Sequence, residues 1–350
     1  KPLVNGIVDF LNDTSVKIFG PNKAASQLEG SKIFTKKLCE KYKIPTAKFG
    51  IFQNSDETIK FIDKTNLPIV IKADGLAAGK GVYICENKDE ARNAVDEIFR
   101  GKFGFAKNIL VEEFLDGEEM SFFVLTDGVS IKCFETAQDH KRVNEGDKGK
   151  NTGGMGAYSP SRLINKDLEE KILYQIINPT LKGLKEMQIE YNGFLYAGLM
   201  IKNDEPYLIE YNVRMGDPEC QTILPKLKTD LLEILLSCCD KKLSKINLEW
   251  YQKKSLSIVL CSNGYPDNYK KNSVIKNIKN IKIDENNLCF HAGTKLKEGK
   301  TISVGGRVLN FVSMAESFFE ARKNAIQNIE ILNWQDGFYR KDIGYKVINK

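Results

Sequence analysis

Three polar residues alternate with apolar ones in the segment Leu208-Ile-Glu-Tyr-Asn-Val-Arg214. If this segment is a strand, alternation places Glu210, Asn212 and Arg214 on one face. A carboxylate and a carboxamide oxygen suit Mg²⁺, which proteins commonly share with substrate phosphates. The Arg214 guanidinium is suited to a phosphoryl or carboxyl group. The alternative is a half-buried strand with a polar outer face and no bound metal.

A second pattern is an apolar run, a loop of small residues and another apolar run. In the loop, Gly75, Gly79 and Gly81 allow backbone N–H groups to approach a phosphate closely. Lys72 at the end of the first run and Lys80 in the loop supply positive charge. The spacing is not that of a Walker loop, because only three residues separate the first two glycines. A mobile hairpin without a ligand is the alternative.

Two further stretches are polar although the strands beside them are expected to be buried. The acidic segment 111–120 offers backbone groups to an adenine edge and the Glu118 carboxylate to ribose hydroxyls, although exposed acids are the default interpretation. Residues 138–143 and the glycine-rich loop 151–160 suit a carboxylate or an acyl phosphate. A lone histidine such as His140 is more often structural than catalytic, so no catalytic role is predicted for it.

Composition excludes several classes of protein. The 350 residues, 42% hydrophobic and 28% charged, allow two or three soluble globular domains. The net charge of +6 comes from 52 basic and 46 acidic residues without a basic tract, so no nucleic-acid partner is predicted. Eight cysteines without a C-x-x-C pair indicate a reduced, cytoplasmic protein. No apolar run reaches the roughly 18 residues of a membrane span, so no membrane association is predicted.

The elements that would position these residues follow from periodicity and turn residues. Helices are predicted at 30–39, 55–62 with Ser55 as its cap, 89–99, 166–178 and 229–240. Strands are predicted at 49–52, 68–72, 82–85, 109–114, 121–125, 129–134, 193–201, 206–212 and 256–261, with a strand-like segment at 16–19. A capping box formed by Ser313 and Glu316 is predicted to open a final helix.

Taken together, the motifs resemble a known family. They are, in chain order, G-S-K at 30–32, I-K-A-D-G-L-A-A-G-K-G-V, E-E-F-L-D-G-E-E, Q-D-H-K-R-V, N-T-G-G-M-G-A-Y-S-P, G-F-L-Y-A-G-L-M-I, I-E-Y-N-V-R-M-G-D-P-E, H-A-G-T-K and G-G-R-V-L. The whole chain resembles the glycinamide ribonucleotide synthetase family of the ATP-grasp superfamily. Val213, Met215 and Cys220 depart from the usual pattern, but none removes a charged or metal-binding group. The family usually begins with a Rossmann-like subdomain, most of which would lie before Lys1.

The resemblance implies an α/β protein of the α+β ATP-grasp class, in which two α+β lobes sandwich ATP. Residues 1–20 would be a remnant of the N-terminal subdomain, and 48–115 a small lid module. Residues 21–47 and 116–250 would form the central domain, and 251–350 a C-terminal α+β subdomain.

The resemblance also implies residue roles. ATP would contact Lys32, Lys72, Gly75, Gly79, Lys80, Gly81, Glu112, Glu113, Leu115 and Glu118. Mg²⁺ or Mn²⁺ would bind Glu210 and Asn212. The substrates glycine and 5-phosphoribosylamine would contact Asp139, Lys141, Thr152, Gly153, Gly154, Met155 and Arg214. Catalytic roles are expected for Lys72, Arg214 and Asp217, in a monomer.

The implied reaction joins glycine to 5-phosphoribosylamine through glycyl phosphate, in purine biosynthesis. Two alternatives stay open. Another ATP-grasp ligase, such as a carboxylase-type purine enzyme, would share the lysines, Glu118, Glu210 and Asn212, so Q-D-H-K-R-V and N-T-G-G-M-G discriminate. A non-catalytic nucleotide-binding or scaffolding protein would lack Mg²⁺- and glycine-dependent ADP formation.

Overall fold

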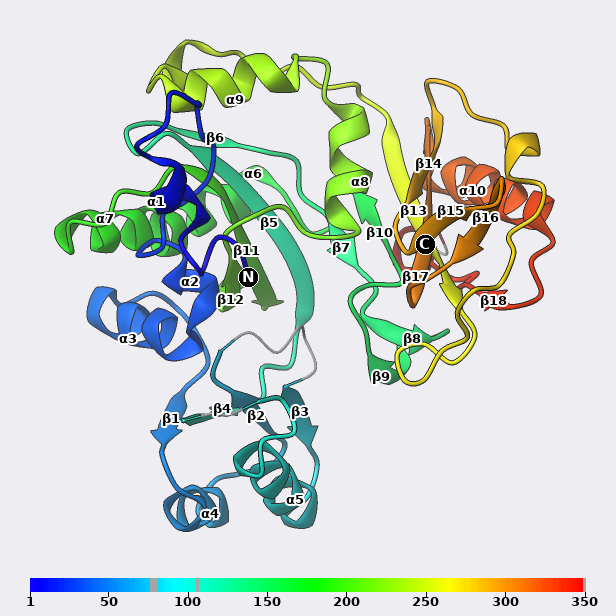
Figure 1. The fold of residues 1–350 in the computed structure, drawn as a ribbon. Helices are drawn as coiled ribbons and strands as arrows, with labels where there is room; N and C mark the ends of the chain where they lie inside the picture. Colours follow the sequence, from blue (N-terminus) through cyan, green and yellow to red (C-terminus); the bar gives the residue numbers. More distant parts are fainter. Residues whose placement is uncertain (76–80, 105–106, 349–350) are drawn as a thin grey trace. The chain divides into compact units, whose positions relative to one another are not determined.

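The computed structural model describes residues 1–75, 81–104 and 107–348, which fall into two compact units (Figure 1). Unit 1 comprises Lys1–Phe134, Leu163–Arg214 and Leu232–Ile246, and unit 2 comprises Glu135–Arg162, Met215–Leu231 and Asn247–Lys350. The compact units cut across the four segments expected from the sequence, and those segment boundaries stay a prediction.

A small antiparallel sheet in unit 1 has the strand order β1-β4-β2-β3. Its strands are β1 (Phe49–Phe52), β2 (Ile69–Ala73), β3 (Val82–Cys85) and β4 (Ile109–Glu113). Helices α4 (Ser55–Asp63) and α5 (Lys88–Phe99) lie beside each other against it (Figure 1). Buried aliphatic side chains on the helices and strands form one core between them. The residue that caps α4 is Asn54, not the predicted Ser55, and its side chain accepts from the Glu57 backbone N–H at 2.9 Å.

A larger antiparallel sheet in unit 1 has the order β12-β11-β5-β6. Its strands are β5 (Glu118–Thr126), β6 (Ile131–Cys133), β11 (Gly193–Lys202) and β12 (Glu205–Asn212). The accompanying helices are α1 (Ile7–Leu11), α2 (Gln27–Gly30), α3 (Lys32–Tyr42), α6 (Lys166–Ile172), the π-helix η1 (Leu173–Ile177), α7 (Asn178–Glu186), α9 (Leu231–Cys239) and the 3₁₀ turn η3 (Leu243–Lys245). A Cβ atom at Gly117, just before β5, would lie only 2.5 Å from the Ile201 carbonyl oxygen of β11. The close approach of these two backbone segments therefore requires glycine.

The main sheet of unit 2 has the order β14-β17-β13-β10-β7, and β18 also pairs with β13. Its strands are β7 (Gln138–Asp139), β10 (Gly156–Ser159), β13 (Lys254–Ser262), β14 (Asn287–His291), β17 (Arg307–Ala315) and β18 (Gly337–Phe338). Two hairpins are formed by β8 (Arg142–Asn144) with β9 (Lys148–Asn151), and by β15 (Thr294–Lys297) with β16 (Lys300–Ser303). The helices are α8 (Glu219–Ile223), η2 (Leu224–Lys226), η4 (Ile278–Asn280), α10 (Phe318–Leu332) and α11 (Tyr345–Ile348).

Besides the cap of α4, two further local predictions are wrong. Residues 16–19 are not a strand, and Val16 is 63% exposed. The predicted capping residue Ser313 lies within β17, whereas α10 begins at Phe318 and is capped by Ser317, four residues after Ser313.

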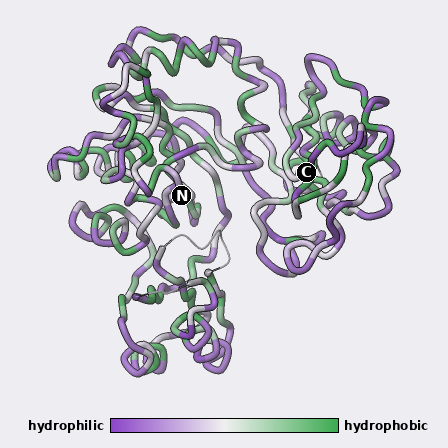
Figure 2. Tube along the Cα trace, in the orientation of Figure 1, coloured by the Kyte–Doolittle hydropathy of each residue, from purple (hydrophilic) through white to green (hydrophobic). Residues whose placement is uncertain are grey.

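Figure 2 shows hydrophobic residues recurring along the strands of both units and on α9. In the part of the chain that the structure describes, buried apolar side chains accordingly form three clusters, two in unit 1 and one in unit 2. Among the described residues, no helix is both long enough and apolar enough to cross a membrane.

Candidate active site

The strand β12 holds the two residues predicted to bind metal. Glu210 and Asn212 are half-buried on one face, while Tyr211 is buried on the other, as strand alternation requires. Arg214 follows the end of the strand and is exposed, with its Nη2 atom 3.1 Å from Glu29 Oε1 and 3.3 Å from Asn212 Oδ1. The third residue of the alternating pattern is therefore held by an ion pair beside the strand end.

A lysine at the start of α3 lies near this strand. Lys32 Nζ donates to the Gly75 carbonyl oxygen at 2.9 Å. Burial lowers the pKa of Lys32, and the Glu210 carboxylate opposes that change, which places these two predicted site residues close together. Asp74 fixes the start of the helix, because its Oδ1 atom accepts from the Ser31 hydroxyl at 3.2 Å and from the Ile33 N–H at 3.3 Å.

The glycine loop is described only at its two ends. Gly75 has a φ of +96°, and no atom of the described residues lies within 4 Å of where a side chain would begin, so backbone conformation favours glycine there. Gly81 is buried, and its carbonyl oxygen accepts from the Ala73 N–H at 2.9 Å. The predicted phosphate-loop residues Gly79 and Lys80 lie outside the described residues.

The predicted ATP residues Lys72 and Glu112 form a buried ion pair across β2 and β4. Lys72 Nζ lies 2.8 Å from Glu112 Oε2, and both side chains are almost fully buried. The other carboxylate oxygen lies 3.1 Å from Nζ of Lys36, a residue that sequence analysis did not select. One carboxylate is thus shared by two ammonium groups.

Three further predicted ATP residues lie from the end of β4 to the start of β5. The Glu113 carboxylate accepts from the Lys48 N–H at 2.9 Å, and the Glu113 N–H donates to the Lys48 carbonyl at 3.0 Å. Its side chain therefore fixes the neighbouring backbone. Leu115 is half-buried, and Glu118 is the first residue of β5, paired in register with Ile201.

In unit 2, Arg307 contacts two of the residues that were predicted to bind substrate or act in catalysis. Its Nη1 atom donates to the carbonyl oxygens of Gly153 at 2.6 Å and Asp217 at 2.7 Å. Its Nη2 atom lies 3.2 Å from Asp217 Oδ2. The Tyr265 hydroxyl accepts from the Gly153 N–H at 3.0 Å. Arg307 and Tyr265 were not selected from the sequence, although the Gly-Gly-Arg motif contains the arginine.

The predicted loop residues around Thr152 are closely interlocked. The Thr152 hydroxyl donates to the Lys141 carbonyl at 2.8 Å and accepts from the Gly154 N–H at 3.0 Å. Gly154 has a φ of +113°, and a side chain there would lie 2.8 Å from Asp139 Oδ1 and 2.4 Å from Pro218 Cδ. Glycine is therefore required both by conformation and by space.

Met155 differs from the other predicted substrate residues. It is completely buried, its N–H donates to the His140 carbonyl at 2.9 Å and its carbonyl accepts from the Val259 N–H at 3.0 Å. It belongs to the hydrophobic core of unit 2. Its side chain has no access to a ligand in this arrangement, so it supports the loop from beneath.

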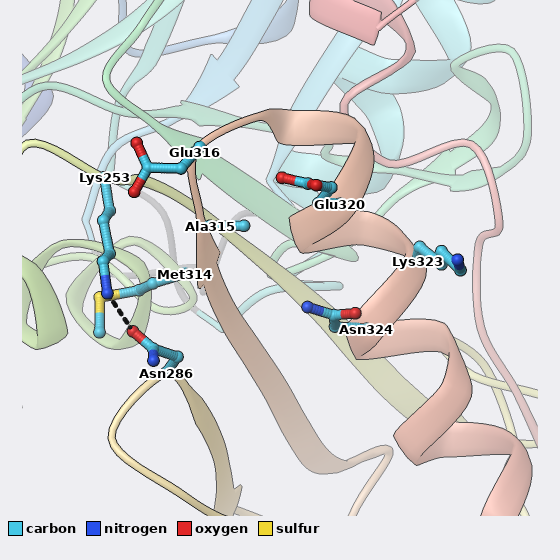
Figure 3. A pocket seen from close by; sticks show the side chains of 8 residues that line it. All are labelled: Lys253, Asn286, Met314, Ala315, Glu316, Glu320, Lys323 and Asn324. Carbon is cyan, nitrogen blue, oxygen red and sulfur yellow. Dashed lines mark hydrogen bonds between the residues drawn. The ribbon is translucent and has the colours of Figure 1, made fainter.

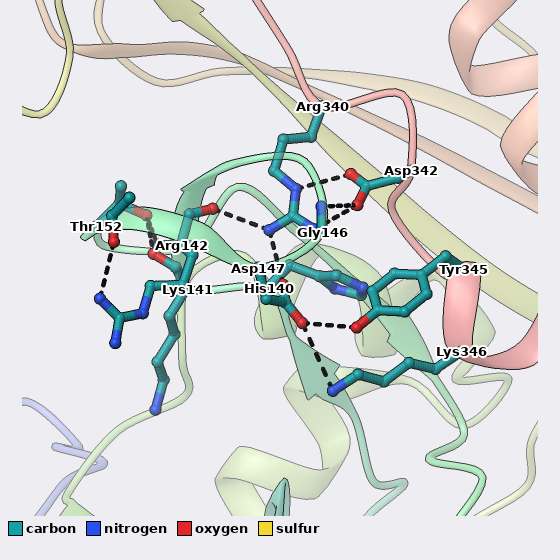
Figure 4. Close-up of polar contacts among 12 residues, drawn as sticks. His140, Lys141, Arg142, Gly146, Asp147, Thr152, Arg340, Asp342, Tyr345 and Lys346 are labelled. Carbon is teal, nitrogen blue, oxygen red and sulfur yellow. Dashed lines mark hydrogen bonds and ion pairs between the residues drawn. The ribbon is translucent and has the colours of Figure 1, made fainter.

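The hairpin β8–β9 next to this loop is clamped by the C-terminal segment of unit 2 (Figure 4). Arg340, 1% exposed, donates to the Arg142 carbonyl and to Asp147 Oδ1, both at 2.9 Å, and to the Asp342 carboxylate at 2.7 and 2.8 Å. The ion pairs with Arg340 hold the pKa of both carboxyl groups below their usual range against the opposing effect of burial. The negative charges of two half-buried carboxylates thus compensate the positive charge of the buried guanidinium.

A pocket in unit 2 lies around the start of α10 and contains none of the predicted site residues (Figure 3). Lysine and glutamate side chains both line it, and Lys253 Nζ donates to Asn286 Oδ1 at 2.7 Å. The lining residues are Lys253, Asn286, Met314, Ala315, Glu316, Glu320, Lys323 and Asn324.

The donor set on β12 supplies part of the oxygen ligands that a divalent cation requires. Within the described ranges, no group of three His, Cys, Asp or Glu side chains is placed to hold a metal. One carboxylate and one carboxamide oxygen on one strand face do fit Mg²⁺ or Mn²⁺ that takes its remaining ligands from phosphate and water.

Comparison with known families gives two matches. Residues 30–220 match the family described as phosphoribosylglycinamide synthetase, ATP-grasp (A) domain, and residues 255–346 match phosphoribosylglycinamide synthetase, C domain. The α+β ATP-grasp fold class expected from the sequence is thereby confirmed.

Individual relatives agree with the family matches. The chain is 45% identical over 350 residues to phosphoribosylamine–glycine ligase of Brucella melitensis. The aligned region covers 100% of this chain and 82% of that protein. It is 46% identical over 355 residues to the chloroplastic phosphoribosylamine–glycine ligase of Arabidopsis thaliana, with 67% of that protein covered. The crystal structure of phosphoribosylamine–glycine ligase from Thermotoga maritima matches with a TM-score of 0.87 and 36% identity, over 97% of this chain and 84% of that chain.

Proposed function

Because the chain belongs to the phosphoribosylglycinamide synthetase family, we propose that it joins glycine to 5-phosphoribosylamine in an ATP-dependent ligation. The products are glycinamide ribonucleotide, ADP and phosphate, in purine biosynthesis. The observation that carries this proposal is the convergence of Lys32, Gly75 and Glu210 in unit 1, at the residues that the family resemblance assigns to phosphate and metal.

The proposed ATP site lies in unit 1. Lys32 and Lys72 bind phosphate oxygens, with Glu112 holding the second lysine. The backbone of 113–115 meets the adenine edge, and the Glu118 carboxylate binds ribose hydroxyls. Gly75 and Gly81 at the two ends of the glycine loop are proposed to contact the phosphates, as are Gly79 and Lys80, which lie outside the described residues.

Glu210 and Asn212 would hold Mg²⁺ or Mn²⁺. When bound, the cation would neutralise the negative charge that develops on the phosphate oxygens during phosphoryl transfer.

The proposed reaction has two displacement steps. A glycine carboxylate oxygen attacks the γ-phosphorus of ATP, its bond to the β-phosphate oxygen breaks, and ADP leaves with that electron pair. The amine of 5-phosphoribosylamine then attacks the carbonyl carbon of glycyl phosphate and displaces inorganic phosphate, losing a proton as the amide forms. The protein positions the reactants and excludes water from an acyl phosphate that would otherwise hydrolyse.

The proposed acceptor residues divide between the two units. In unit 2, the interlocked Thr152–Gly154 loop offers backbone groups, and Asp139 and Lys141 flank it. Asp217 lies against Arg307 in the same unit. In unit 1, Arg214 is exposed beside Asn212 and is suited to an anionic substrate group.

The test is product formation by the full chain. ADP release is measured with Mg²⁺, ATP, glycine and freshly generated 5-phosphoribosylamine, and glycinamide ribonucleotide is identified by mass. We expect product only when all four are present, and glycine hydroxamate when hydroxylamine replaces the acceptor. Bicarbonate with aminoimidazole ribonucleotide replaces the substrates in a parallel reaction. Turnover there, or nucleotide binding without any turnover, would overturn the proposal.

We also propose that the chain acts in the cytoplasm as a monomer, without nucleic-acid or membrane partners. The charge distribution and the abundance of free cysteines support this. The Arabidopsis thaliana relative is named as chloroplastic.

A further inference from the structure

Lys36 is a buried lysine whose ammonium group donates two hydrogen bonds and forms one ion pair. It lies on α3 and is 3% exposed. Its Nζ atom lies 2.6 Å from the Thr46 hydroxyl oxygen, 3.4 Å from the Ala47 carbonyl oxygen and 3.1 Å from Glu112 Oε1. Buried lysines are rare unless they are paired in this way.

The partner carboxylate of Lys36 also holds Lys72. Burial pushes the pKa of Glu112 upward, but the Lys72 and Lys36 ammonium groups outweigh it and the pKa is lowered. The trio therefore contains two positive charges and one negative charge, a net charge of +1. Without Lys36, Lys72 and Glu112 would neutralise each other, and less positive charge would be directed at a bound phosphate.

The same ammonium group reaches the metal-binding strand through Thr46. The Thr46 hydroxyl donates to the Leu208 carbonyl at 2.6 Å, and the Leu208 N–H donates to the Pro45 carbonyl at 2.8 Å. Leu208 lies two residues before Glu210, so two hydrogen bonds and one ion pair connect β12 with Glu112 of β4.

We propose that Lys36 is a positioning residue of the ATP site. It fixes Glu112 so that Lys72 keeps its place and its uncompensated charge beside the nucleotide phosphates, and it ties the small sheet of unit 1 to the metal-binding strand. Lys36 itself does not contact the nucleotide. The inference rests on the proposed function insofar as Lys72 binds ATP phosphates.

The experiment is a double-mutant cycle on nucleotide binding, read out by calorimetry with a non-hydrolysable ATP analogue and Mg²⁺. We expect Lys36→Met to raise the dissociation constant of the analogue roughly tenfold. In a Glu112→Gln background the same substitution should change it less than twofold, because Lys36 acts through that carboxylate. A role in folding alone would give equal losses in the two backgrounds, and that result would overturn the proposal.

Three further measurements sharpen the outcome. Lys37→Met, at the exposed neighbouring position of α3, is the matched control and should bind the analogue as the wild type does. Lys36→Arg keeps the positive charge and should recover part of the lost affinity. If Lys36→Met does not fold, as judged by circular dichroism, Lys36→Arg in the same two backgrounds gives the same comparison.

Steady-state kinetics separate this proposal from the function itself. Lys36→Met should raise the KM for ATP while leaving the KM for glycine unchanged. If the wild type makes no glycinamide ribonucleotide but the binding cycle shows the expected coupling, the function fails and the role of Lys36 stands. An unchanged dissociation constant in Lys36→Met would reject the role of Lys36 whatever the wild type catalyses.

Discussion

Glutamates of the same site are distinguished by what their oxygens already bind. The Glu113 carboxylate accepts a hydrogen bond from the Lys48 N–H, and the two oxygens of Glu112 form ion pairs with Lys36 and Lys72. Within the described residues, the Glu210 carboxylate has no hydrogen bond, and the positive charge near it is Lys32. Glu210 is therefore the carboxylate best able to accept a cation without breaking an existing bond.

Glu210→Gln should abolish most turnover while the nucleotide still binds. The substitution keeps the shape and removes one charged ligand from the place where charge develops, so we expect a loss of roughly 100-fold or more in kcat. Glu205→Gln, on the same strand but paired with Lys171 in solvent, is the control and should keep normal activity. Near-normal ADP release from Glu210→Gln at limiting Mg²⁺ would contradict the metal assignment.

The environment of His140 predicts how the stability of the protein depends on pH. It is buried in unit 2, its Nε2 atom accepts from the Gly344 N–H at 3.2 Å, and its Nδ1 atom has no hydrogen-bond partner within the described residues. Burial, followed by the Arg340 and Lys346 charges, lowers its pKa to about 4, although Asp147 and Asp342 oppose this. The ring is therefore neutral in the folded protein at neutral pH.

Stability should fall as the pH drops from about 6.5 towards 4. In this range the unfolded chain binds a proton at His140 and the folded protein does not, so folding becomes less favourable. Between pH 7 and 5 the contribution is about 2 kcal/mol. Urea unfolding should show His140→Gln losing this part of the pH dependence, whereas His291→Gln, at an exposed histidine, should retain it. An unchanged slope in the first variant would mean that the ring titrates normally.

At the scale of elements, the start of α10 shows why one sequence prediction was wrong. Both Ser313 with Glu316 and Ser317 with Glu320 match the capping-box pattern. Ser313 pairs with Leu256 and Asn287 inside the sheet, and that burial excludes it as a helix start. The second serine caps the helix, since the Ser317 hydroxyl oxygen accepts from the Glu320 N–H at 3.2 Å. The local sequence pattern predicted that a serine caps this helix, but the pairing of β17 within the sheet determines which serine it is.

Ser317→Ala should lower the free energy of unfolding by about 1 kcal/mol, the usual cost of losing a helix cap. Glu316→Ala, at the position of the rejected box, should change it by less than about 0.5 kcal/mol because the residue is exposed. Chemical denaturation of the two variants and the wild type measures both effects. Equal losses would place the cap at the earlier serine.

Sequence reasoning identified strands more reliably than the residues that support the site. Alternation predicted β12 and the shared face of Glu210 and Asn212, because period-two burial is local. Lys36 and Arg307 were missed because their partners are distant in sequence, at Glu112 and Gly153. Met155 was predicted to contact substrate because it lies in the glycine-rich motif, and only the packing shows that its side chain belongs to the hydrophobic core.

At the scale of the whole molecule, neither unit is a continuous piece of chain. The chain passes between the two units five times. The sheet built around β13 and β17 is completed by β10 and β7, which lie far earlier in the sequence. Sequence segmentation cannot reveal such an arrangement, because the strands that pair are separated by the whole of β11 and β12.

The segment 247–350 should therefore not fold by itself. Without β10, the core residues Leu256 and Ile258 lose their neighbours and β13 gains an unpaired edge. Near-UV circular dichroism of the fragment should show no fixed aromatic environment. A single chain in which residues 135–162 and 215–231 are joined to it by flexible linkers should show one. A cooperatively folded isolated fragment would show that the earlier strands are dispensable.

The pairing of β10 with β13 also sets an order of events on the ribosome. Gly156 is opposite Ile258, so β10 emerges roughly 100 residues before its partner and waits about 5–20 s at ordinary rates of synthesis. Arg340, which clamps the β8–β9 hairpin, emerges later still than β13. During that interval β7 and β10, of two and four residues, are too short to offer a long edge to other chains. The brevity of these strands thus protects the nascent chain until unit 2 can close.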